Sequence, residues 1–154
     1  MKNFLKIFTL SLFGIFGAQQ ASAAQVGGTG VGIVLGEPSG LSAKHWVSSE
    51  NAIQAGLAFS LDENDYIYLQ ADYLWHVPGL VKLNSAEFLL HYGVGAAFGF
   101  ADAGSAFAIR GPVGLSYKFA QAPVDIFVEL APIFLLSPDT DLDIQFGIGS
   151  RYYF

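Results

Sequence analysis

The stretch Gln145-Phe146-Gly147-Ile148-Gly149-Ser150-Arg151-Tyr152-Tyr153-Phe154 ends the sequence, and its side chains alternate in character. One parity is mostly apolar and aromatic, and the other is small or polar. An alternation with period two predicts a β-strand with two different faces. A strand at a chain end leaves an unpaired edge unless another strand covers it. We therefore expect this strand to pair with the first strand of the chain and close a ring.

The same alternation recurs upstream, over about fourteen residues in each of two further segments. The predicted strands are 27–36, 41–48, 52–61, 66–76, 87–100, 106–119, 123–136 and 142–154. Clusters of glycine, proline, serine, asparagine and aspartate between them indicate turns, at 36–40, 48–51, 62–65, 77–85, 101–105, 120–123 and 137–141. The sequence therefore predicts an all-β fold, an eight-stranded antiparallel up-and-down β-barrel.

The composition is unusual for a water-soluble domain, since only 13% of the residues are charged, where about 25% is typical. Part of this bias lies in residues 1–23. Lys2 and Lys6 precede or flank the start of an apolar run, and Ala21-Ser22-Ala23 has the small residues of a cleavage site. This pattern is typical of a secretory signal peptide. We therefore expect residues 24–154 to form the barrel domain of an exported protein.

Charge and cysteine content exclude some function classes. Without Lys2 and Lys6, the chain has 7 − 2 = 5 basic residues against 13 acidic ones, which argues against nucleic acid as a partner. The chain has no cysteine, so disulfides cannot stabilise it. A closed sheet or a packed core must do so instead.

The two faces of the predicted strands decide which solvent surrounds the barrel. The apolar face is bulky and aromatic, with Leu115, Val128 and Ile148 as members, whereas the other face is rich in glycine and alanine. An eight-stranded barrel is just wide enough for side chains to fill it, so small residues suit its interior. The apolar face should then point outward to lipid, which predicts a transmembrane barrel. Aromatic residues near the strand ends would form two girdles, one from Trp75, Tyr117, Phe119, Tyr152 and Phe154, the other from Phe98, Phe100, Phe107 and Phe134.

The last residues carry a family resemblance. Gly149, Tyr152 and Phe154 are spaced as in the C-terminal assembly signal of bacterial outer-membrane barrels. With eight strands and a signal peptide, the chain resembles the small barrels typified by the OmpA transmembrane domain and by OmpX. This resemblance implies a monomer in the bacterial outer membrane that contacts lipid and lipopolysaccharide and is recognised by the barrel-insertion machinery.

The inward face should carry the ionisable residues. The predicted interior network consists of Lys44, Asp72, Glu87, His91, Arg110, Lys118, Asp125, Glu129 and Arg151, with Asp143 on the same face. Lys118 would pair with Asp125 across a hairpin, and Arg151 would lie near Asp125 and Glu129. Since an isolated buried ion is costly, we expect salt bridges that close the lumen. The resulting role is structural or at the cell surface.

Catalysis is not expected, because the predicted strands do not place a nucleophile, a histidine and an acid within hydrogen-bond reach of one another. His45 and Ser48 lie on opposite faces of one strand, and no serine adjoins His91 and Glu87. We expect no metal and no cofactor either. Two alternatives stay open: a narrow channel or small-solute conduit, and a soluble periplasmic barrel that binds an apolar ligand.

Overall fold

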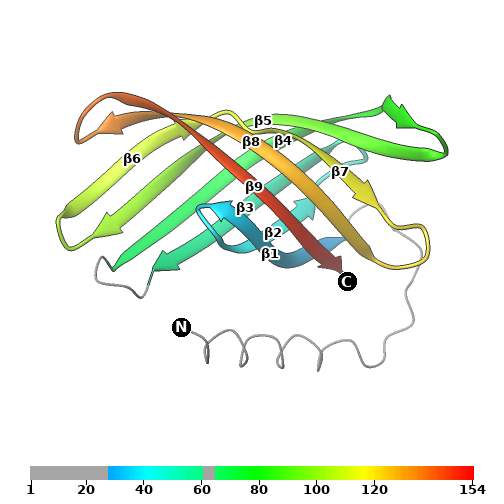
Figure 1. The fold of residues 1–154 in the computed structure, drawn as a ribbon, viewed down its shortest axis with the longest axis horizontal. Coiled ribbons are helices and arrows are strands. Elements are labelled where there is room, and N and C mark those ends of the chain that lie inside the picture. The colour runs from blue at the N-terminus through cyan, green and yellow to red at the C-terminus, as the bar shows by residue number, and fades with distance from the viewer. Residues whose placement is uncertain (1–27, 61–64) are drawn as a thin grey trace.

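The computed structural model describes residues 28–60 and 65–154, which form a single antiparallel sheet of nine strand segments (Figure 1). The segments are β1 (Thr29–Glu37), β2 (Gly40–Trp46), β3 (Asn51–Ser60), β4 (Tyr66–Leu83), β5 (Ala86–Ala101), β6 (Gly104–Arg110), β7 (Val113–Lys118), β8 (Val124–Ser137) and β9 (Asp141–Tyr153). The predicted signal peptide lies outside the described residues.

The sheet closes on itself, because β1 pairs with β2 along one edge and with β9 along the other. The other strands pair with their sequence neighbours, except that β6 and β7 do not pair with each other and both pair with β5 and β8. The nine segments fill eight positions around the ring, since β6 and β7 both lie between β5 and β8. The predicted eight-stranded antiparallel up-and-down barrel, closed by its first and last strands, is confirmed.

The predicted strand 106–119 is divided by Gly111 and Pro112. Proline has no backbone N–H to donate, so the ladder is interrupted at this point. The break still contacts both neighbouring strands: the Gly111 N–H donates to the Pro132 carbonyl, and the Pro112 carbonyl accepts from the Gly93 N–H, both at 2.9 Å. The two segments therefore act as one interrupted strand of the ring.

The predicted turn 77–85 is wrong, because β4 continues to Leu83 and only residues 84 and 85 turn. Asn84 adopts a φ of 56°, a left-handed conformation that asparagine tolerates well. Val77 pairs with Leu90 and Val81 with Phe88, so three residues of β4 lie opposite one of β5. Pro78 and Gly79 thus mark a bulge inside a long hairpin, although the same two residues usually signal a turn.

Two ends of the barrel can be distinguished. The terminal end holds Thr29 and Phe154 together with the β2–β3, β4–β5 and β7–β8 turns, and the far end holds the β1–β2, β5–β6 and β8–β9 turns. Trp75 and Tyr92 stack at 5.8 Å between ring centroids toward the terminal end, and Phe98 and Phe107 lie 4.9 Å apart toward the far end.

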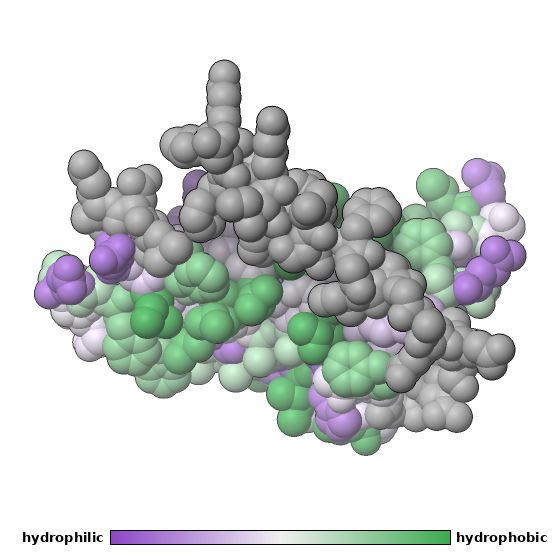
Figure 2. All heavy atoms as spheres, turned by 90° about the horizontal axis from the view of Figure 1, so that it is seen from below, coloured by the Kyte–Doolittle hydropathy of each residue, from purple (hydrophilic) through white to green (hydrophobic). Residues whose placement is uncertain are grey.

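The barrel wall has an apolar outside and a polar inside. Large exposed side chains on the outer face include Leu35, Ile67, Val94, Val128 and Ile148. Figure 2 shows apolar side chains gathered along one such face, with strongly hydrophilic residues mainly near its two ends. The buried polar residues are Ser42, Lys44, Gln54, Asp72, His76, His91, Arg110, Ser116, Asp125, Glu129 and Arg151. Across residues 28–60 and 65–154, no helix is long and apolar enough to cross a bilayer.

Candidate functional site

Arg110 forms the centre of the polar interior, at the end of β6. Its Nε lies 3.0 Å from Asp72 Oδ1, and its Nη2 donates to Glu129 Oε1 at 2.7 Å. Its Nη1 donates to the side-chain oxygens of Gln145, at 3.1 Å, and of Gln70. One guanidinium therefore ties together side chains from β4, β8 and β9.

Glu129 and Gln54 extend this network toward the terminal end. Glu129 Oε2 accepts from Gln54 Nε2 at 2.9 Å and lies 3.2 Å from His91 Nε2. The Gln54 side-chain oxygen accepts from Arg151 Nη1 at 2.8 Å. The predicted proximity of Arg151 and Glu129 is thus indirect, through a glutamine that bonds to both.

Arg151 and Asp125 form the next layer, on the adjacent strands β9 and β8. Arg151 Nε is 3.4 Å from Asp125 Oδ1, and its guanidinium lies over the Phe127 ring at 3.9 Å from the centroid. The Tyr153 hydroxyl donates to Asp125 Oδ2 at 2.7 Å. Because both Asp125 oxygens have donors, this carboxylate is well satisfied even though it is fully buried.

Lys44 and His76 lie at the terminal end of the interior. His76 Nδ1 is 3.0 Å from the Glu50 carbonyl, which can only accept, so Nδ1 carries the hydrogen. His76 Nε2 is then the acceptor for Lys44 Nζ, at 2.7 Å. The Lys44 ammonium also lies 4.5 Å from the centroid of the Trp46 ring, within the range of a cation–π contact.

Lys118 lies opposite Asp125 in the β7–β8 ladder, as the hairpin predicts. Its ammonium nevertheless lies over Trp46, at 4.1 Å, and over Tyr153, at 5.5 Å. Among the described residues, no ion pair within 4 Å joins Lys118 to Asp125. Lys118 therefore borders the interior network at its terminal mouth.

Glu87 does not join the interior network, which corrects the prediction from parity. It pairs in register with Lys82 near the tip of the β4–β5 hairpin, and its side chain is exposed. The hairpin extends past the ring, so the face that points inward elsewhere meets solvent there. Asp143 is likewise exposed, at the far end of β9.

Several interior residues were missed by reasoning from charge alone. Gln54 bridges Glu129 and Arg151. Gln70 and Gln145 accept hydrogen bonds from Arg110, Tyr153 donates one to Asp125, and His76 and Trp46 contact Lys44. Their signal in the sequence is the inward parity that they share with the charged residues.

A glycine on that face makes room for one large side chain of the network. A Cβ at Gly114 would lie 2.7 Å from two atoms of the His91 ring. The small residues of the inward face therefore accommodate the long polar ones on the neighbouring strands.

The residues of the predicted C-terminal assembly signal have local roles as well. A Cβ at Gly149 would lie 2.7 Å from Phe127 Cε1, so glycine leaves space for that ring inside the barrel. Tyr152 pairs with Val31 and Val124 in the two ladders of β9. The Phe154 N–H donates to the Thr29 carbonyl at 3.0 Å, and its side chain is exposed.

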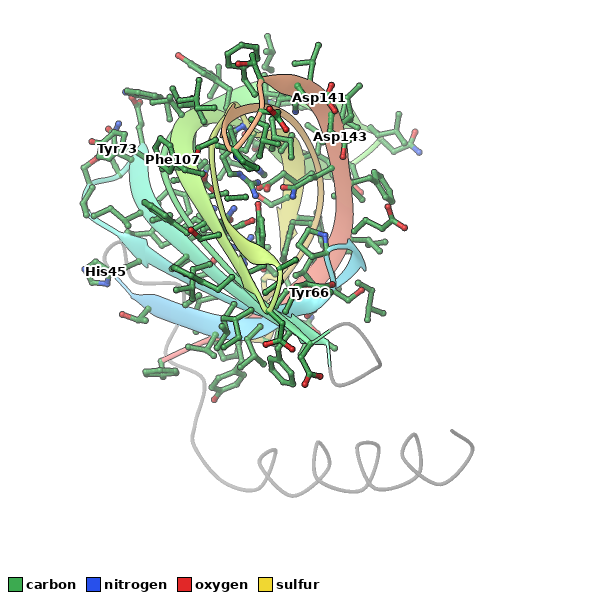
Figure 3. All side chains as sticks on the ribbon, turned by 90° about the vertical axis from the view of Figure 1, so that its left-hand side faces the viewer. His45, Tyr66, Tyr73, Phe107, Asp141 and Asp143 are labelled. Carbon is green, nitrogen blue, oxygen red and sulfur yellow. The ribbon has the colours of Figure 1, made fainter. Side chains whose placement is uncertain are left out.

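The arrangement favours a closed interior. Viewed from the far end, side chains fill the ring (Figure 3). Two interior cavities of about 30 and 40 Å³ share Pro38, Gln70 and Glu129, and each is the size of one or a few water molecules. Within the described residues, no group of three or more His, Asp or Glu side chains could hold a metal ion.

No family model matches the chain, and no curated protein sequence matches it. Among solved structures, it is similar to the crystal structure of the N-terminal β-barrel domain of Pseudomonas aeruginosa OprF. The TM-score is 0.51 and the sequence identity 12%, over 84% of this chain and 98% of that one. A likeness at this identity concerns the fold, and it confirms the resemblance to small eight-stranded barrels.

Proposed function

We propose that this chain spans the bacterial outer membrane as a structural or surface β-barrel with a largely closed lumen and no catalytic activity. The observation that carries the proposal is the reversed polarity of a closed ring. Buried Arg, Lys, Asp and Glu side chains lie inside, and exposed Leu, Ile, Val and Phe side chains lie outside. In hydrocarbon every backbone N–H and C=O needs an internal partner, which a closed barrel provides. A soluble barrel for an apolar ligand would need the opposite polarity.

The interior network supports the closed state of the lumen. Arg110 contacts two carboxylates and Arg151 a third, so opening a wide path would separate several buried ion pairs. Separating one partner of a buried pair is strongly unfavourable, because the other charge remains uncompensated. The ion pairs inside the lumen then hold the strands of the ring together.

The partners follow from the same surfaces. The apolar outer face would contact lipid, and the far end would lie near lipopolysaccharide. The insertion machinery would recognise Gly149, Tyr152 and Phe154. The ring is closed along most of its height, and lengths that lack a partner on one side lie near strand ends, such as the short end of β9 beyond Phe146 and the end of β3 beyond Ala58, so the protein would be a monomer. Nucleic acid is not a partner in this proposal.

Cell fractionation followed by electrophoresis of unheated and boiled samples in detergent tests the proposal. We expect the protein in the outer-membrane fraction, with an unheated band that migrates differently from the boiled one because the barrel resists detergent. Recovery in the soluble periplasmic fraction, without a heat-dependent shift, would refute the membrane assignment.

A narrow conduit is the second candidate. The two small cavities favour it, because they lead from Pro38 near the far end to Glu129 at the centre. Planar-bilayer recording separates the two candidates. The structural proposal expects no steady conductance from the unmodified protein, and a reproducible small conductance would favour the conduit.

A further inference from the structure

The barrel wall has a gap on one side of its far end. The β1–β2 pair stops at Glu37 and Gly40, whereas β9 continues to Asp141 and β3 to Ser60. Beyond the Phe146–Glu37 pair, β9 pairs only with β8, and beyond the Ala58–Gly40 pair, β3 pairs only with β4. Figure 1 shows the short blue and cyan hairpin ending well before the β5–β6 and β8–β9 turns. We call this gap the side notch.

The side notch contains a cavity of about 490 Å³. Its lining residues are Gly36, Glu37, Pro38, Ser39, Phe59, Tyr66, Tyr68, Asp143, Ile144 and Gln145. Small-molecule sites in proteins usually have volumes of about 300–1,000 Å³. Figure 3, seen from the far end, shows Tyr66 and Asp143 at the rim, on β4 and β9. The side notch is therefore large enough for a small organic ligand.

A hydrogen bond forms the floor of the side notch. The Tyr68 hydroxyl donates to the Gln145 side-chain oxygen at 3.0 Å, and this oxygen also accepts from Arg110. Beneath this bridge the two interior cavities measure only about 30 and 40 Å³. A ligand larger than a few atoms would therefore stop at Tyr68 and Gln145.

The lining of the side notch selects the sign of charge. Glu37 and Asp143 supply two carboxylates, and none of the described lining residues is Lys or Arg. Asp143 Oδ1 accepts from the Ile144 N–H at 2.8 Å, which holds this carboxylate at the rim. The aromatic side chains of Phe59, Tyr66 and Tyr68 complete the walls. Aromatic ring faces attract organic cations, so carboxylates and rings favour the same ligand.

An apolar groove lies beside the side notch on the outer face. Its cavity measures about 640 Å³ and is lined by Leu57, Phe59, Asp65, Tyr66, Ile67, Phe100, Ala101 and Asp102. Phe59 and Tyr66 line both the groove and the notch. In a bilayer or a micelle, alkyl chains cover this outer face, so a ligand with a cationic head in the notch would lay its own alkyl chain among them, across these two rings.

We propose that the side notch binds an organic ammonium compound that carries a short alkyl chain. The ammonium group lies among Glu37, Asp143 and the tyrosine rings, and the chain packs on Leu57, Ile67 and Phe100. An anionic amphiphile of the same length is repelled by the carboxylates. A hydrated inorganic cation gains nothing from the aromatic walls or the apolar groove.

A titration of the folded protein in uncharged maltoside micelles tests this proposal. The probe is hexyltrimethylammonium, followed by NMR through the Gln145 side-chain amide and the Tyr66 and Tyr68 rings. We expect saturable shifts at these groups with hexyltrimethylammonium, and none with hexyl sulfate or magnesium at the same concentrations. Absence of saturable shifts, or equal shifts with the sulfate, would overturn the proposal.

A pair of substitutions distinguishes binding at the side notch from attraction by the overall negative charge of the protein. Glu37→Gln with Asp143→Asn should raise the dissociation constant for hexyltrimethylammonium at least tenfold. The control pair, Glu50→Gln with Asp139→Asn, removes the same two charges away from the notch and should change it less than twofold. Equal weakening by both pairs would show that long-range charge, and no defined site, attracts the probe. Since all substituted side chains are exposed, both proteins should fold, and the test does not depend on the proposed membrane location.

Discussion

Arg110 shows how single residues stabilise the inside of this barrel. Its guanidinium contacts Asp72 and Glu129 at once and also bonds to Gln70 and Gln145, so all its strong interactions lie inside the ring. Buried carboxylates without a cation are costly, because water is not available to solvate them. Arg110 is therefore the residue whose loss should matter most in the interior.

Replacing Arg110 with methionine tests this role. The change keeps much of the side-chain volume but leaves Asp72 and Glu129 without their common cation. We expect the free energy of unfolding to fall by about 3–5 kcal/mol, the usual cost of breaking a buried ion pair. Urea titration of the barrel in lipid vesicles measures this free energy of unfolding. Lys82→Met, on the exposed hairpin, is the control and should change stability by less than about 0.5 kcal/mol; similar losses in both variants would contradict the role.

Glycines on the inward face offer a second test at the same scale. A Cβ at Gly114 would press first on the backbone carbonyl of Val128 and then on the His91 ring, whereas a Cβ at Gly99 would meet only the Ala106 Cβ, at 3.9 Å. Gly114→Ala should therefore destabilise the barrel by about 1–3 kcal/mol, as overpacking does. Gly99→Ala should be neutral or slightly stabilising. Equilibrium unfolding measures the stability of both variants, and equal stabilities would mean that both the His91 ring and the β8 backbone at Val128 can move to accept the extra methyl group.

The β4–β5 hairpin shows that a strand can contain a two-residue insertion without a change in which side chains face outward. Its bulge at Pro78 and Gly79 adds two residues to β4, so Val77 and Val81 remain on the same face. Because the side-chain period of a strand is two, an insertion of two residues preserves the faces, whereas an insertion of one reverses them. The hairpin can therefore be long and irregular without exposing a polar residue on the outer face.

Deletions within the bulge test this reading of the hairpin. Removing Pro78 and Gly79 together should restore one-to-one pairing. The unheated electrophoretic band, and the temperature at which it converts to the boiled form, should be nearly unchanged. Removing Pro78 alone should turn Lys82 to the outer face and Val81 and Leu83 to the inner one, which lowers that temperature. If the variant with the single deletion were as stable as the variant with the double deletion, the alternation of faces would not determine the stability of this hairpin.

At the scale of the whole molecule, the β1–β9 seam makes the sheet a barrel. Eight residue pairs join these two strands, from Gly30–Tyr153 to Glu37–Phe146. Both strands would otherwise present an open edge, which favours aggregation. The seam also joins the two most distant parts of the described sequence, so its formation requires the complete ring.

A disulfide across the seam tests closure. Leu35 and Ile148 lie directly opposite each other and outward, where Cβ atoms are about 4.5–5.5 Å apart, close to disulfide distance. Since the chain has no other cysteine, Leu35→Cys with Ile148→Cys should oxidise to a cross-linked form that migrates faster after boiling without reductant. Leu35→Cys with Ile144→Cys is four residues out of register and should cross-link poorly. Equal cross-linking of both pairs would argue against a fixed seam.

The sequence by itself determined the two faces of the strands and most of the strand positions. This information is local, because a period of two assigns each residue to one face whatever its partner is. The same parity predicted the inward position of Lys44, Asp72, His91, Arg110, Asp125, Glu129 and Arg151. It failed for Glu87 and Asp143, because parity does not show where a strand leaves the ring.

Only the tertiary structure decided which side chains meet and where the wall is incomplete. Arg110 contacts Gln70 and Gln145, which lie on strands far from it in sequence, because the stagger of the closed ring sets their common height. The break at Pro112, the long β4–β5 hairpin and the side notch likewise depend on how far each strand pairs with its neighbours. Pairing length and stagger are properties of the whole ring, and the alternation within one strand does not contain them.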